Sequence, residues 1–194
     1  MSGDFYKEWR SKAEIDYFPQ LVILWLSTNS WYRSHYSEIA TRRDRDFLNK
    51  LRDDHSTRNK LFTRFNKLLQ SADTKAHAEL INNIEALSFA LNTALLLWEE
   101  DKYDSAITFS NCLLTPPPQS KTYGSIIVKS RAQGIAISNK LKLTDDKSLL
   151  FNCILEIIYQ VRCQLVHGQL EPKVENHEVV KQCYFLLHSL MDFS

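Results

Sequence analysis

An apolar stripe near the C-terminal end of the chain most constrains how this sequence can fold. Between residues 150 and 165 apolar side chains recur at helical spacing, and on a helix they fall within roughly 100° of arc. The stripe comprises Leu150, Ile154, Ile157, Ile158, Val161 and Leu165. Gly168 is suited to end such a helix, and Pro172 prevents its continuation. The pattern predicts a buried core helix that stops abruptly.

Other segments show the same helical spacing. They are Phe5–Tyr17, Gln20–Tyr36, Arg43–Asp53, Ser56–Gln70, Asp73–Leu97 and a final helix around Val179–Leu190. Pro19 interrupts or kinks the chain between the first two, and Ser71 or Asp73 can cap the fifth. With only 4 glycines in 194 residues, helices are favoured over tight hairpins. We expect an all-α, up-and-down helical bundle in which residues 1–194 form one domain.

The segment from residue 101 to residue 144 does not fit this pattern. Three consecutive prolines, Pro116 to Pro118, exclude a regular element there, and Gly124 and Gly134 interrupt the residues between them and the apolar stripe. Ser125–Lys129 can form a short β-strand; otherwise the segment is an irregular insertion.

Charge and composition exclude several classes of protein. The net charge of +1 gives no general attraction to nucleic acid or to membranes, so RNA binding would need a local patch. Residues 33–64 are rich in arginine and lysine but also carry acidic residues, which favours a solvated helix face over a nucleic-acid surface. Leu21–Leu26 is too short to span a bilayer, and no signal peptide is evident. The four cysteines are widely spaced, so we expect free thiols, a cytoplasmic location, and no cofactor or membrane partner.

The segment from residue 157 to residue 168, IIYQVRCQLVHG, holds the strongest candidates for chemistry. Arg162 lies at the edge of the apolar stripe, where packing can hold its stem while the guanidinium stays hydrated. His167 lies in the last helical turn, beside carbonyl groups that favour an imidazolium. Five residues correspond to about 140° of rotation, so the two side chains do not share a face. They converge if the helix end unwinds or if a second subunit completes the groove, which favours a homodimer.

This run resembles the C-terminal signature of the HEPN superfamily, in which R-x4-6-H precedes a helix end. Asp16-Tyr17-Phe18-Pro19 and the segment from Leu24 to Tyr32, LWLSTNSWY, resemble the N-terminal helix of its Apea-like branch. The resemblance covers both ends of the chain but not residues 101–144. It implies an all-α bundle that dimerises so that two R-x4-6-H motifs share one cleft, and catalytic members cut RNA there without metal.

The resemblance assigns Arg162 as the clamp on the scissile phosphate and His167 as the acid and base. An arginine fork can stabilise charge on phosphate oxygens, and a histidine can move a proton at neutral pH. Attack by the ribose 2′-hydroxyl would leave a 2′,3′-cyclic phosphate. Many nuclease members carry a polar residue directly after the arginine, where this chain has Cys163. Either Gln164 takes that role or the site is degraded.

Asn29 and Tyr159 are the supporting candidates. Asn29 is a polar residue in an apolar helix, where a buried amide needs partners, and we expect it to bond toward the Arg162 region. Tyr159 belongs to the motif itself. His177, Cys183 and His188 are too scattered around their helix for a metal site. The aromatic cluster of Trp25, Trp31, Tyr32 and Tyr36 is suited to a core more than to base stacking.

Three functions remain open from the sequence. The first is a metal-independent endoribonuclease, acting as a toxin or defence effector with an antitoxin or nucleotidyltransferase partner. The second is a non-catalytic HEPN module that binds RNA, a nucleotide or a protein. In the third, Arg162 and His167 merely bond helix-end carbonyls and a carboxylate such as Glu156, and the chain is a helical interaction protein.

Overall fold

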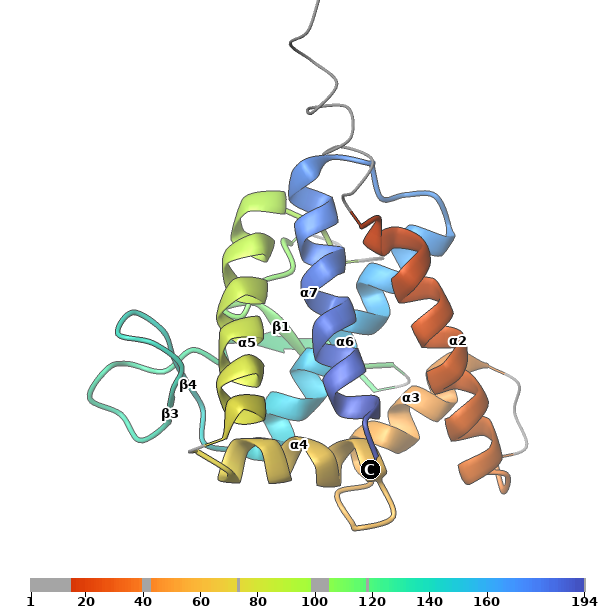
Figure 1. Cartoon of the computed structure of the whole chain (residues 1–194), viewed down its shortest axis with the longest axis horizontal. Coiled ribbons are helices and arrows are strands. Elements are labelled where there is room, and N and C mark those ends of the chain that lie inside the picture. Colours follow the sequence, from red (N-terminus) through yellow and green to blue (C-terminus); the bar gives the residue numbers. More distant parts are fainter. Residues whose placement is uncertain (1–14, 40–42, 73, 99–104, 118, 194) are drawn as a thin grey trace, which may run out of the picture.

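The computed structural model describes residues 15–39, 43–72, 74–98, 105–117 and 119–193. Within them lie the helices α2 (Tyr17–His35), α3 (Asp44–Asp53), α4 (Lys60–Gln70), α5 (Lys75–Ala94), α6 (Lys147–Val166) and α7 (Val174–Met191). Figure 1 shows α5, α7 and α2 side by side, α6 behind them, and α3 and α4 crossing near one end. The expected helical bundle is confirmed.

The central helix is α6, which carries the apolar stripe predicted from the sequence. Leu150, Ile157, Ile158 and Val161 are fully buried, and buried side chains cover most of its circumference. The helix ends in a Schellman motif: the Gln169 amide donates to the Gln164 carbonyl at 2.8 Å, and the Gly168 amide donates to the Leu165 carbonyl at 3.2 Å. Gly168 takes the left-handed conformation that this motif requires, with φ +68°.

The composition of α6 also meets the criteria for a membrane span. The helix is 20 residues long, but most of it is buried inside the bundle. Core helices meet the same criteria, and α6 packs against α2, α3, α4 and α7. Its apolar character is therefore explained by contacts within the chain.

The boundaries of α2 and α5 differ from those expected. α2 begins at Tyr17, so Pro19 lies in its first turn, where its missing N–H costs nothing. Thr74 is the N-cap of α5: its Oγ1 accepts from the His77 amide at 3.1 Å. α5 ends at Ala94 because Leu95 turns left-handed at φ 54°.

α4 begins at Lys60 rather than at Ser56, because the Asn59 side chain caps it. The helix expected at Phe5–Tyr17 lies outside the described residues except for its last three, and of these only Tyr17 is helical.

The insertion between α5 and α6 contains two small antiparallel sheets. β1 (Cys112–Thr115) pairs with β2 (Thr122–Gly124), and β3 (Ile135–Ala136) pairs with β4 (Lys142–Leu143). Of the two alternatives for Ser125–Lys129, the strand is wrong, because that segment forms only an isolated bridge between Ile127 and Leu143. Ile107, Phe109, Cys112 and Ile126 are buried in the common core, whereas the β3–β4 hairpin projects from the bundle (Figure 1).

Candidate functional site

Arg162 lies where α6 meets α2 and α3. Its guanidinium is placed over the Trp25 ring, with its central carbon 5.7 Å from the ring centroid, and its Nη2 lies 3.4 Å from Asp44 Oδ2. The Arg162 side chain is 17% exposed, and its Nε is buried with no hydrogen-bond acceptor among the described residues. The structure thus holds the Arg162 side chain in place and leaves it partly exposed.

Asp44, the first residue of α3, joins Arg162 to α2. Its Oδ1 accepts from Asn29 Nδ2 at 2.9 Å and from Arg33 Nη2 at 2.6 Å, and Arg33 Nε donates to Asn29 Oδ1. Asn29 therefore reaches the Arg162 region through the Asp44 carboxylate. Two guanidinium groups share one carboxylate, so these four residues carry a formal charge of +1, which favours an anion. We call Asn29, Arg33, Asp44 and Arg162 the Arg162 cluster.

His167 is exposed at the end of α6. It is the C-cap, with φ −84° and ψ 3°, and its amide still donates to the Cys163 carbonyl at 2.9 Å. The helix is therefore wound through His167, and helical geometry separates the two side chains by about 140°. Unwinding of the helix end, one of the two routes by which they could converge, does not occur in this chain.

The two residues after Arg162 have different partners. Cys163 is 6% exposed, with the Arg162 Nη1 at 3.9 Å from its Sγ. Gln164 is 7% exposed and donates through Nε2 to the Leu97 carbonyl at 2.6 Å. Gln164 therefore fastens α6 to the segment after α5, on a different side of the helix from the Arg162 cluster.

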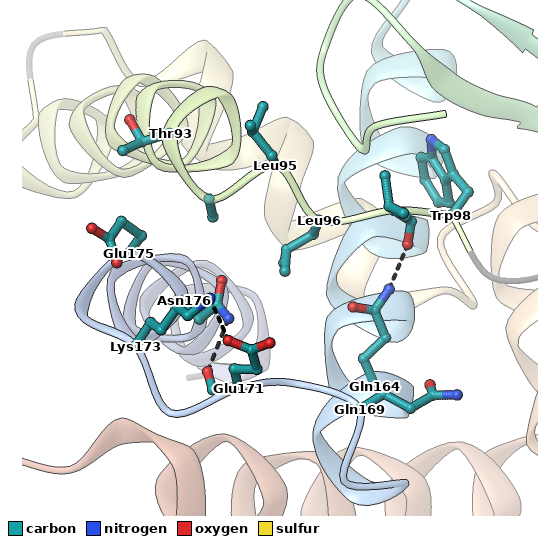
Figure 2. A pocket seen from close by; sticks show the side chains of 12 residues that line it. Thr93, Leu95, Leu96, Trp98, Gln164, Gln169, Glu171, Lys173, Glu175 and Asn176 are labelled. Atoms are coloured by element: carbon teal, nitrogen blue, oxygen red, sulfur yellow. Dashed lines mark hydrogen bonds and ion pairs between the residues drawn. The ribbon is translucent and has the colours of Figure 1, made fainter. Parts of the chain in front are cut away.

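Figure 2 shows Gln164 extending from α6 into a cavity of about 720 Å³ between α5 and the start of α7. The charged groups that line it are Glu171, Lys173 and Glu175, which sum to a formal charge of −1. Lys173 and Glu171 pair with each other, and Asn176 Nδ2 donates to the Glu171 carbonyl at 2.9 Å. This lining does not favour a phosphate.

Tyr159 packs between Trp25 and Arg45. Its ring lies 5.7 Å from that of Trp25 and 4.3 Å from the guanidinium carbon of Arg45. Burial is the main cause that raises the pKa of the Tyr159 hydroxyl well above its usual range, and the nearby Cys163 raises this pKa further. Tyr159 is therefore neutral at physiological pH and acts as a packing surface and hydrogen-bonding group.

Glu156 is not the partner of Arg162 suggested by the sequence. It is fully buried, and both of its oxygens accept from Arg45 Nη1, at 2.9 and 2.7 Å. Arg52, 2% exposed, donates to Oε2 at 2.6 Å, and Gln160 Nε2 donates to Oε1 at 3.1 Å. Burial is the largest influence on Arg45 and lowers its pKa, but the Glu156 carboxylate more than offsets this, so the net pKa is raised.

In the basic segment at residues 33–64, five of the described arginines pair with carboxylates within the chain, and Arg42 lies outside the described residues. The pairs are Arg33–Asp44, Arg45–Glu156, Arg52–Glu156, Arg58–Glu38 and Arg64–Asp192. The aromatic cluster is mainly core, as expected: Trp25, Tyr32 and Tyr36 are at most 1% exposed. Among the described residues no group of three His, Cys, Asp or Glu side chains could hold a metal ion.

We expect Asp44→Asn to lower the free energy of unfolding by about 1 to 2 kcal/mol, because the change removes the charge that holds Arg33 and Arg162 together. Urea unfolding followed by circular dichroism measures this. Asp46→Asn, in the same turn of α3, is the control, since Asp46 lies outside the Arg162 cluster. Equal losses in the two variants would show that Asp44 does not hold the cluster.

A comparison of the chain with protein-family models, with curated proteins and with solved structures finds no match.

Proposed function

We propose that the chain is a HEPN-like, metal-independent endoribonuclease that acts as a homodimer. The observation that carries the proposal is that the Arg162 side chain is already held in position. Trp25 and Asp44 fix its partly exposed guanidinium near the helix end that carries an exposed His167. An arginine held in place before the substrate arrives loses less conformational entropy on binding a phosphate. The imidazole supplies a group that changes its protonation near neutral pH.

The proposal requires two copies of the chain. Because the helix is wound through His167, one chain does not bring both groups to the same phosphate. In a two-fold dimer each phosphate would meet Arg162 of one copy and His167 of the other. A second copy could cover apolar surface on α2, where Ile23 and Leu26 are 60% and 58% exposed. Both residues lie close to Asn29 in the sequence.

The proposed reaction needs only these side chains and the RNA. His167 accepts the proton of the ribose 2′-hydroxyl, the 2′-oxygen attacks the adjacent phosphorus, and the bond to the 5′-oxygen breaks. His167 then gives the proton that it accepted to the leaving 5′-oxygen, and Arg162 stabilises the charge on the phosphate oxygens. The products are a 2′,3′-cyclic phosphate and a 5′-hydroxyl. We place this activity in the cytoplasm, which agrees with four described cysteine thiols that are buried and unbridged. There the chain would act as a toxin or defence effector that an antitoxin or nucleotidyltransferase partner restrains.

The decisive experiment incubates the purified chain with total RNA in EDTA. We expect cleavage with 2′,3′-cyclic phosphate ends, reduced by about a hundredfold or more in His167→Ala. His188→Ala, which removes another exposed histidine, is the control and should cleave like the parent. Cleavage by neither the parent nor the control would overturn the nuclease proposal, as would equal cleavage by His167→Ala.

A second candidate function is a non-catalytic module that binds RNA through the same cluster. The observation in its favour is that neither residue after Arg162 supplies a free polar side chain there, since Cys163 is buried and Gln164 bonds to Leu97. RNA binding without cleavage, weakened by Arg162→Gln, would support this function over the first.

A further inference from the structure

A cavity of about 330 Å³ lies along α4, beside the loop that joins α3 to α4. Phe62, Asn66 and Gln70 are four positions apart, as are Thr63 and Lys67, so these five residues line it from one side of the helix. The remaining lining residues are His55, Ser56 and Thr57 of the loop and Ser71 at the helix end. All of the lining residues belong to the described part of the chain.

Most polar side chains of this cavity have no partner within the described part of the chain. Ser56 Oγ donates to Asp54, and Ser71 Oγ donates to the Lys67 carbonyl at 2.8 Å. Six other side chains make no hydrogen bond or ion pair with the described residues; they are His55, Thr57, Thr63, Asn66, Lys67 and Gln70. Their hydrogen-bonding groups are therefore available to a ligand.

Asn66 contributes a hydrogen-bond acceptor that is shielded from solvent. Its Oδ1 is buried and has no donor among the described residues. A buried amide oxygen without a donor is costly. Because Asn66 lines the cavity, rotation of its amide about one side-chain bond brings this oxygen to a ligand. A ligand with hydroxyl groups satisfies the oxygen, whereas a bare anion brings only acceptors.

Two rings give the same cavity an apolar surface. The centroids of the His55 and Phe62 rings lie 4.9 Å apart, and both residues line the cavity. A sugar ring has a matching distribution of groups, since its C–H face is apolar and its edge carries hydroxyls. Ligand cavities commonly combine aromatic side chains with a few polar groups in this way. The volume is near the lower end of the roughly 300 to 1,000 Å³ typical of such cavities, which favours a single ring.

We infer that this cavity binds one ring of a neutral sugar. A hydroxyl both donates and accepts, so it can pair with the Asn66 oxygen, the Lys67 ammonium and the Gln70 amide alike. The C–H face of the sugar packs against His55 and Phe62. The cavity shares no residue with the Arg162 cluster, and its occupancy does not depend on RNA cleavage.

Titration of the whole chain with matched probes, followed by NMR at the side-chain amides of Asn66 and Gln70, tests this inference. Methyl β-D-glucopyranoside and methyl β-D-ribofuranoside are the sugar probes, and we expect a dissociation constant of about a millimolar for the better of them. Tighter binding of the riboside identifies the sugar of RNA as the source, and tighter binding of the glucoside a saccharide. Tetrahydropyran-2-methanol keeps the ring but only one hydroxyl, and should bind at least about tenfold more weakly. Binding of glucose 6-phosphate without binding of either sugar would show an anion site and overturn the inference.

Two variants locate the binding. Asn66→Leu and Gln70→Ala should each weaken the better sugar by about fivefold, the loss typical of one neutral hydrogen bond. Asn66→Leu should do so without lowering the free energy of unfolding, because it removes a buried oxygen that has no donor among the described residues. Asn92→Leu, the same substitution at an exposed position of α5, should bind like the parent. The inference is overturned if neither sugar binds the parent at millimolar concentration, if tetrahydropyran-2-methanol binds as tightly as the sugars, or if both cavity variants bind like the parent.

Discussion

Glu156→Gln should lower the free energy of unfolding by about 3 to 5 kcal/mol, the loss expected when one partner of a buried ion pair is removed. The carboxylate is fully buried and compensates Arg45 and Arg52, which approach it to 2.7 and 2.6 Å. Glutamine keeps the size of the side chain but removes its charge, so two guanidinium groups would remain without a counter-charge. Urea unfolding followed by circular dichroism gives the free energy directly.

The matched control is Glu79→Gln, the same substitution in an exposed pair with Lys75 on α5. Exposed pairs contribute at most about 1 kcal/mol, so this variant should unfold nearly like the parent. A double variant, Glu156→Met with Arg52→Met, should lower the free energy of unfolding by less than Glu156→Gln does, because it removes a buried cation together with its partner. If Glu156→Gln and Glu79→Gln lost equal amounts, the buried cluster would not stabilise the fold.

Mixing two inactive variants should restore RNA cleavage if the proposed ribonuclease site is shared between two copies. Arg162→Ala keeps His167, and His167→Ala keeps Arg162, so each variant alone lacks one group at both sites. A mixed dimer regains one complete site, made of Arg162 from one copy and His167 from the other. With equal amounts and random pairing, half of the dimers are mixed, so activity should return to about a quarter of that of the parent.

The variants are co-refolded so that their subunits exchange, and cleavage is compared with each variant refolded alone at the same total concentration. A site built within one chain predicts no recovery, because neither chain then has both groups. Failure to recover would therefore contradict the shared site even if the parent cleaves RNA. The parent's cleavage in EDTA tests the nuclease proposal separately.

The sequence predicted the helices best where the apolar period and a stop signal coincide. For α6 the stripe, Gly168 and Pro172 gave the element and its end correctly. For α5 the apolar period predicted a helix end that is too late. Leu95 continues the stripe but takes a left-handed conformation and is 65% exposed. In the insertion, the strands are two to four residues long, and their positions depend on contacts with the core that have no local signature.

The partners of the candidate site could not be read from local spacing. Arg162 and Asn29 were recognised, but Asp44, which joins them, belongs to a third helix whose position is a tertiary property. Glu156 offered a usable signal: it is a lone carboxylate in an apolar helix, and no lysine or arginine lies three or four residues away on either side. Such a residue must find a cation elsewhere in the fold, as Glu156 does with two residues of α3.

The pairing of distant segments sets the order in which this chain can fold. The Tyr17 amide bonds to a His177 nitrogen across 160 residues, and Arg45 reaches Glu156 across 111. During synthesis α2 and α3 therefore emerge long before α6 and α7 exist to cover them. Their apolar faces remain exposed in the growing polypeptide as binding surface for chaperones, and the bundle closes only after most of the chain has left the ribosome.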